Sequence, residues 1–238
     1  MGLCDCTKAE GVASLTLNDP PVNGYSYEMM RELDAAILDA RMDPAVQVLV
    51  LSGGGERFFC AGANIDMLQE ADPTFKYYFC LHANETLNRL EHTPKLTIAA
   101  INGHCVGGGL EVAMACDLRI ARKLPDGGKS AQIALPEVNL GVLPGTGGTQ
   151  RLVQLVGKGK ALELMMTGDM IDAEEALRLG LVNHVTEQEE LLPLARKIMQ
   201  KILAKAPVAI AHVIEAVNGY FDFRENGFEN EIELFADC

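Results

Sequence analysis

The segment from Asn102 to Asp117, NGHCVGGGLEVAMACD, constrains the fold more than any other part of the chain. The apolar run 96–101 before it is typical of a buried strand, and the run 110–116 predicts a helix that enters the core. Between them, the glycines at 107–109 let the backbone approach another group closely, because no Cβ intervenes. A strand, a glycine run and a helix start leave unpaired N–H groups at the positive end of a helix dipole. Such groups suit an anion, or an oxygen that gains charge during a reaction.

A second junction of the same kind lies earlier in the chain. The apolar strand 47–52 is followed by a glycine-rich loop that runs to Ala63, and Asn64 is a good N-cap for the next helix. Two junctions near Ala63 and Gly108 can each donate one N–H to the same oxygen. The alternative, two unrelated turns, remains open from these residues alone.

Two glutamates stand out by their surroundings. Glu111 is the one charge inside the apolar helix after the glycines, and Glu137 lies in a Pro- and Gly-rich loop with few charges. Burial of Glu137 would raise its pKa. The plainer alternatives are a helix-start carboxylate that favours the dipole and a solvated loop carboxylate.

The remaining pattern predicts an α/β protein, since strands and helices alternate over the first two thirds and the last third is all helix. The strand 47–52 is apolar enough to be covered on both faces. Asp172 and Glu175 predict a capping box for a helix that Gly180 ends. The other predicted strands are 12–17, 117–121 and 182–185, and the other predicted helices are 26–41, 75–91, 158–167, 189–205, 208–217 and one that begins near 224.

Composition excludes several classes of protein. The 238 residues are enough for one large domain, and the formal net charge of −13 argues against nucleic acid or an anionic membrane as partner. Seven cysteines without a CxxC pair do not form a secreted disulfide framework. The first twenty residues lack a signal pattern, and no apolar run reaches membrane length. We therefore expect a reduced, soluble, cytoplasmic protein.

Four motifs in order resemble the enoyl-CoA hydratase/isomerase, or crotonase, superfamily, and the chain is most like an enoyl-CoA hydratase. The motifs are Phe59–Ile65, Asn102–Gly103 with Gly107–Glu111, Pro136–Arg151, and Thr167–Val182. The resemblance implies a spiral core of ββα turns over residues 1–185. It also implies that the helical region 186–238 builds homotrimers, often paired into hexamers.

The sequence departs from the family pattern at three places. Asn64 stands where an Asp is usual, although Asn also caps a helix. The loop Arg122–Ser130 is longer than usual, and the family's last helix, with its basic tail, is missing.

The resemblance also implies the site. The N–H groups of Ala63 and Gly108 would form an oxyanion hole for a thioester carbonyl, and Glu111 and Glu137 would be catalytic. A side chain at Gly108 is expected to fill the space of the thioester oxygen while leaving the protein folded. No metal and no separate cofactor is expected, because coenzyme A is part of the substrate. The expected substrate contacts are Arg57 as a phosphate partner, Ala61, Ala63, Asn64, Ile65, Asp66 and Gly108, with Met67, Leu68, Phe75, Tyr78 and the loop 135–143 lining the acyl pocket.

The implied reaction is hydration of a 2-enoyl-CoA to a 3-hydroxyacyl-CoA. A double-bond isomerase or a hydratase of a cyclic dienoyl-CoA is the alternative, because one fold and one oxyanion hole serve many reactions. An RNA-binding relative is the non-enzymatic alternative. The net charge of −13 and the absence of a basic, aromatic-interleaved stripe count against RNA binding.

Overall fold

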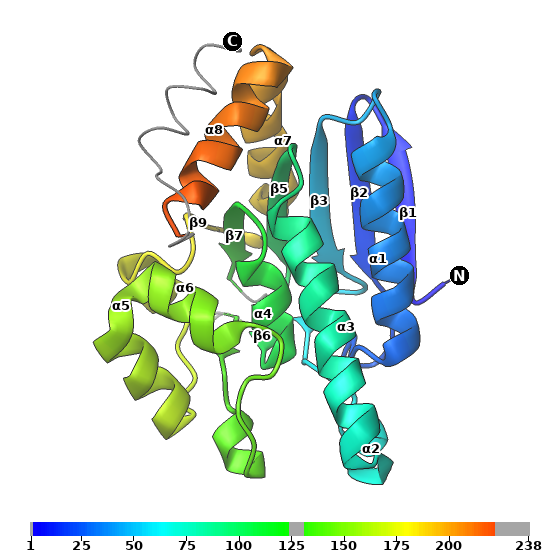
Figure 1. Ribbon diagram of the computed structural model, residues 1–238. Helices are drawn as coiled ribbons and strands as arrows, with labels where there is room; N and C mark the ends of the chain where they lie inside the picture. Colours follow the sequence, from blue (N-terminus) through cyan, green and yellow to red (C-terminus); the bar gives the residue numbers. More distant parts are fainter. Residues whose placement is uncertain (1, 124–130, 222–238) are drawn as a thin grey trace.

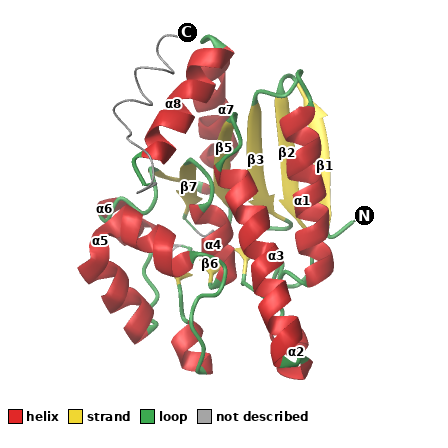
Figure 2. Cartoon of the chain, viewed as in Figure 1, coloured by secondary structure: helices red, strands yellow, loops and turns green. Residues whose placement is uncertain are grey.

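The computed structural model describes residues 2–123 and 131–221 and has two sheets with helices around them (Figures 1 and 2). The larger sheet has the strand order β1-β2-β3-β5-β7-β9, in which only the β1–β2 pair is antiparallel. The smaller sheet has the parallel order β4-β6-β8. The strands are β1 Cys4–Ala9, β2 Val12–Leu17, β3 Val48–Gly53, β4 Phe58–Cys60, β5 Leu96–Ile101, β6 His104–Val106, β7 Leu118–Arg122, β8 Ile133–Ala134 and β9 His184–Thr186.

The order of strands along the chain builds a spiral. Each of the pairs β3–β4, β5–β6 and β7–β8 gives its first strand to the large sheet and its second to the small one, and helices follow each pair. This confirms the predicted α/β class and the ββα turns. The helices are α1 Tyr27–Met42, α2 Ile65–Glu70, α3 Pro73–Glu91, α4 Gly108–Met114, α5 Gly148–Thr167, α6 Ala173–Arg178, α7 Leu191–Leu203 and α8 Pro207–Gly219, with 3-10 turns η1 Glu137–Leu140 and η2 Gln188–Glu190.

Both faces of the large sheet are covered, as the apolar β3 sequence predicted. Leu49 and Leu51 of β3 belong to the main core, which α1, α3 and α4 complete. Val48 and Val50 point to a second core that α7 closes from the other side. Figures 1 and 2 show α1 and α3 in front of the sheet and α7 behind it.

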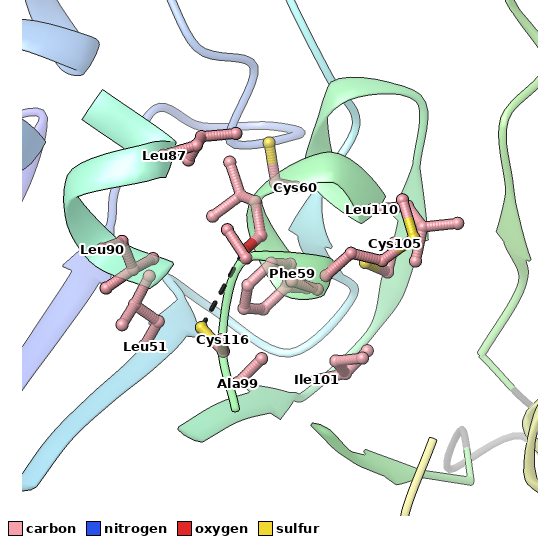
Figure 3. Close-up of a cluster of buried hydrophobic side chains, with 14 of the residues drawn as sticks. Leu51, Phe59, Cys60, Leu87, Leu90, Ala99, Ile101, Cys105, Leu110 and Cys116 are labelled. Carbon is pink, nitrogen blue, oxygen red and sulfur yellow. Dashed lines mark hydrogen bonds between the residues drawn. The ribbon is translucent and has the colours of Figure 1, made fainter. Parts of the chain in front are cut away.

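The main core continues between the two sheets. The Phe59 ring of β4 is fully buried there, and Figure 3 shows it among side chains of β3, β5, β6, α3 and α4. Phe59 and Cys60 of β4 and Cys105 of β6 are fully buried in this core. The positions of the loops that follow β4 and β6 are fixed as a consequence.

Most helix boundaries lie within two residues of those predicted, and the start of α5 is the large exception. Helix α4 begins at Gly108, two residues before the predicted start at Leu110, and ends at Met114. Helix α5 begins at Gly148, although the sequence predicted a helix only over 158–167, and it bends at Gly157, where φ is 77°. Glycine favours loops over helices in both places, but tertiary packing overrides that weak local preference.

The last third of the described chain is mostly helical. Asp172 caps α6 by accepting from Glu175 N at 2.8 Å, and Gly180 adopts the left-handed conformation just after that helix, as predicted. The second half of the predicted capping box is not formed among the described residues, because the Glu175 carboxylate accepts two hydrogen bonds from Arg178 at 2.6 Å instead. No single helix within residues 2–123 and 131–221 has the length and apolarity to cross a membrane, although α7 and α8, bent by 108°, pass that test as a pair. Most of the longer loop 122–130 and the helix predicted near 224 lie outside the described residues.

Candidate active site

The structure brings the two glycine-rich junctions together. Strands β4 and β6 pair in parallel, so the segments that follow them leave the small sheet side by side. A Cβ placed on Gly62 would lie 2.9 Å from the backbone nitrogen of Gly108, which shows how closely the two backbones approach. Gly62 has φ 91° and therefore sits in the region that glycine tolerates best. The two turns are therefore neighbours in space.

Backbone pairing orients the first segment. Tyr25 N donates to Gly62 O at 2.9 Å, and Asn64 N donates to Tyr25 O at 2.9 Å. In this parallel bridge between Tyr25 and Ala63, the N–H of Ala63 faces away from Tyr25. Asn64 also accepts from Met67 N at 3.0 Å, which confirms its predicted role as the N-cap of α2.

The N–H groups of Ala63 and Gly108 have no hydrogen-bond acceptor among the residues that the structure describes. Gly107 N donates to Ala134 O at 2.8 Å, which pins the start of α4 to β8. Gly108 is the first residue of α4, where N–H groups have no partner within the helix. That the two donors bind one thioester oxygen stays a prediction.

Glu111 is buried, at 2% exposure, and is held by the start of α5. Its Oε1 accepts from Thr146 N at 2.8 Å and from Gly148 N at 2.7 Å, and its Oε2 accepts from the Thr146 hydroxyl. Gly148 begins α5, so the carboxylate of one helix caps the N-terminus of another and compensates its dipole. After three bonds, the remaining acceptor capacity is mainly on Oε2.

Glu137 lies at the first position of η1 with its carboxyl turned inward. Its Oε1 would be 3.2 Å from a Cβ on Gly107, so the carboxyl lies beside the start of α4. Its Oε2 is buried and has no hydrogen-bond partner among the described residues. Burial raises the pKa of Glu137 to about 7, and the charge of Glu111 acts in the same direction. The predicted effect of burial on this carboxyl is therefore confirmed, and the solvated alternative is wrong.

We expect the Glu137 carboxyl of the free protein to titrate near pH 7, well above its ordinary value of 4.5. An infrared band of the protonated carboxyl should disappear as the pH rises through this region and should be absent from Glu137→Gln. Between pH 4.5 and about pH 7, this carboxyl is protonated in the folded protein and ionised in the unfolded chain, so the folded state binds more protons. The free energy of unfolding should therefore fall as the pH rises across this window. A native titration near 4.5 would contradict this expectation.

Three side chains that the sequence analysis missed hold the loop around Glu111. Asn84 Nδ2 donates to Gly145 O at 2.8 Å, and the buried Arg151 donates to Thr146 O at 3.2 Å. Arg151 is itself paired with Glu91 at 2.8 Å. Thr146 and Arg151 lay within a recognised motif but were given no role, and Asn84 carried no sequence signal.

The predicted substrate-contact residues differ in exposure. Arg57 is exposed, and its guanidinium lies 5.6 Å from the centre of the Phe58 ring. Ala61, Ala63 and Asn64 are partly exposed, while Ile65 and Asp66 are exposed in the first turn of α2. Of the predicted pocket residues, Met67 and Leu68 are half-buried, and Phe75, Tyr78, Leu140 and Leu143 are exposed. Across residues 2–123 and 131–221, no cluster of three or more His, Cys, Asp or Glu is arranged to hold a metal ion.

The expectation for a side chain at Gly108 is wrong. A Cβ at this position would lie 2.2 Å from the hydroxyl oxygen of Tyr25 and 2.6 Å from its ring. Tyr25 is 2% exposed, so the ring has little room to move. Replacement of Gly108 would therefore disturb packing as well as any ligand, and it cannot test the N–H donor alone.

Comparisons with known proteins agree with this architecture. The sequence profile of the enoyl-CoA hydratase/isomerase family matches residues 7–238. The chain is 41% identical over 229 residues to the short-chain-enoyl-CoA hydratase of Clostridium acetobutylicum, with 95% of this chain and 85% of the relative covered. It is also 41% identical to the crotonyl-CoA hydratase of Syntrophomonas wolfei, with 97% and 87% covered.

Similarity extends to the three-dimensional structure. The crystal structure of an enoyl-CoA hydratase from Geobacillus kaustophilus superposes with a TM-score of 0.93 at 40% identity. That alignment covers 99% of this chain and 88% of the other. On the match of the family profile and on these identities, the chain belongs to the enoyl-CoA hydratase/isomerase family.

Proposed function

We propose that the protein is an enoyl-CoA hydratase, which adds water across the double bond of a 2-enoyl-CoA to give a 3-hydroxyacyl-CoA. The observation that carries the proposal is that Glu111 of α4 and Glu137 of η1 both lie beside the start of α4, next to two N–H groups that have no acceptor within the part of the chain that the structure describes. Two relatives named for hydrating short-chain enoyl-CoA and crotonyl-CoA support the same reaction.

The backbone donors would act on the thioester carbonyl. When a nucleophile adds to the β-carbon, negative charge moves to the carbonyl oxygen, and fixed N–H groups of Ala63 and Gly108 stabilise that charge as it forms. The donors belong to a bridged strand and a helix start, so little reorganisation is needed during the reaction. The loop 61–66 and Arg57 would hold the coenzyme A part.

The carboxylates would manage the two protons of the reaction. The oxygen of water bonds to the β-carbon while Glu111, through Oε2, accepts a proton from that water. The electron pair of the double bond moves to the α-carbon and carbonyl oxygen, and Glu137 supplies a proton to the α-carbon. Return of the proton from Glu111 to Glu137 restores the starting state, so the net change is the addition of one water.

The test is the reaction of the purified protein with crotonyl-CoA. We expect loss of the conjugated thioester absorbance and formation of 3-hydroxybutyryl-CoA, identified by mass spectrometry. A 3-enoyl-CoA supplied in parallel distinguishes the isomerase, which would move its double bond without adding water. Isomerisation without hydration would overturn the proposal.

We also propose that the protein forms homotrimers or hexamers through the region 186–238, as its family resemblance implies. Exposed apolar side chains on α8, including Val208, Val213 and Val217, at 54%, 61% and 58% exposure, support a buried role in an assembly. Light scattering at micromolar concentration tests the proposal, and a monomer would contradict it.

A further inference from the structure

Tyr25 contacts both glycine-rich junctions and the loop that holds Glu111. Its backbone pairs with Gly62 and Asn64 on either side of Ala63, and its ring lies against the Cα of Gly108. Its hydroxyl oxygen lies 3.3 Å from Thr146 Oγ1. These partners come from three separate segments, so a single buried side chain connects the two proposed donors with the loop that holds Glu111.

The direction of the hydrogen bonds follows from counting donors. The Thr146 hydroxyl has one hydrogen and donates it to Glu111 Oε2. Its oxygen is then the acceptor for Tyr25, whose hydroxyl must be the donor. Burial, together with the charge of Glu111, raises the pKa of Tyr25 well above its ordinary value, so this hydroxyl keeps its hydrogen. The result is a directed chain from Tyr25 through Thr146 to Glu111.

These hydrogen bonds end on Oε2, the oxygen of Glu111 that can still accept another hydrogen bond. Oε1 already accepts two backbone N–H groups, from Thr146 and Gly148. From the residues that the structure describes, Oε2 accepts one hydrogen bond, from the Thr146 hydroxyl, so its second lone pair is available to a water. The direction of that lone pair depends on where Thr146 Oγ1 is held.

We infer that Tyr25 is a positioning residue for the hydration step, which acts through the Thr146 hydroxyl to orient Glu111 Oε2 toward the attacking water. The inference rests on the proposed function. Tyr25 and Thr146 are both buried, at 2% exposure each, and on this inference they act through Glu111, so their effect should appear in kcat for hydration rather than in KM. Proton exchange at the α-carbon should be spared, because that step belongs to Glu137.

A double-mutant cycle with Tyr25→Phe and Thr146→Val tests the inference on the full chain. Tyr25→Phe keeps the ring against Gly108 and removes one neutral hydrogen bond, so we expect kcat for crotonyl-CoA hydration to fall about three- to tenfold. Thr146→Val should lower it by about ten- to a hundredfold, because the bond to a carboxylate is stronger. In the Thr146→Val background, Tyr25→Phe should change kcat less than about twofold, because the hydrogen bond from residue 146 to Glu111 is already absent.

Two controls separate positioning from packing. Thr146→Ser keeps the hydroxyl and should retain most of kcat, and Tyr27→Phe alters a more exposed ring that contacts Phe75 and should have no effect. Deuterium uptake at the α-carbon of butyryl-CoA should stay within about twofold of wild type in Tyr25→Phe, the margin expected if no bond to Glu137 is lost.

The outcomes are distinct. Additive losses in the cycle, or equal losses of hydration and exchange, would assign Tyr25 a packing role and overturn the inference alone. If Tyr25→Phe failed to fold, the comparison of Thr146→Val with Thr146→Ser would decide, and equal kcat values in those two variants would overturn it. A wild-type protein that does not hydrate crotonyl-CoA would overturn both the inference and the proposed function.

Discussion

Glu137→Gln is expected to remove both hydration of crotonyl-CoA and deuterium uptake at the α-carbon of butyryl-CoA. Glu137 has a buried Oε2 that no described residue hydrogen-bonds, and burial raises its pKa to about 7. Its Oε2 can therefore take up or release a proton, and its pKa allows both forms to be present near neutral pH. Loss of a general acid–base group costs about 10²–10⁴-fold in rate, and both activities should fall by that order.

The stability of Glu137→Gln gives a second, independent result. An ionised carboxylate in this position is disfavoured by burial, whereas a neutral amide carries no such penalty. We therefore expect the variant to unfold at a temperature equal to or above that of the wild type at pH 8. Glu28→Gln, an exposed change in the first turn of α1, is the matched control: it should leave activity unchanged and should not raise the melting temperature, since it removes a charge that favours the dipole of α1. Retention of α-carbon exchange in a folded Glu137→Gln protein would remove Glu137 from the proposed mechanism.

Glu111→Gln is expected to separate the two activities. The Oε1 atom of glutamine can still accept from Thr146 N and Gly148 N, so the cap on α5 is preserved. The base is lost, because the amide nitrogen facing Thr146 cannot accept a proton from water. Hydration should fall by about 10²–10⁴-fold, while α-carbon exchange survives through Glu137.

The control for Glu111→Gln is another carboxylate that caps a helix. Asp172 accepts from Glu175 N at the start of α6, on the exposed surface. Asp172→Asn should leave hydration at the wild-type rate, since only a cap is altered. If Glu111→Gln also hydrates at that rate, Glu111 is a buried helix cap and nothing more. The isomerase alternative would then explain the chain better than hydration.

Local sequence determined the elements whose stability is local or whose pattern is long. The strand β3 and the helices α1 and α3 were predicted within a few residues, because sustained apolar runs and spacings show which faces are buried. Asn64 as an N-cap and Asp172 as an N-cap followed from side-chain chemistry alone. The family resemblance identified both site glutamates. The loop composition around Glu137 predicted that burial would raise its pKa.

Tertiary structure decided the short strands and the start of α5. Strands β4, β6 and β8 have three, three and two residues, too few to show a period, and they exist as strands because they pair with one another. The first turn of α5 is rich in glycine and has poor helix propensity. It is held by contacts from elsewhere in the chain, among them the bond from Gly148 N to Glu111.

The hydrogen-bond network around Glu111 could not be predicted from the sequence either. Tyr25 and Thr146 are 121 positions apart, and Thr146 and Glu111 are 35 apart. A hydrogen bond needs its atoms placed to within a few tenths of an ångström. No periodicity or motif spacing carries that information over such separations. Only the packing of β4, β6, α4 and α5 around one point decides which side chains meet there.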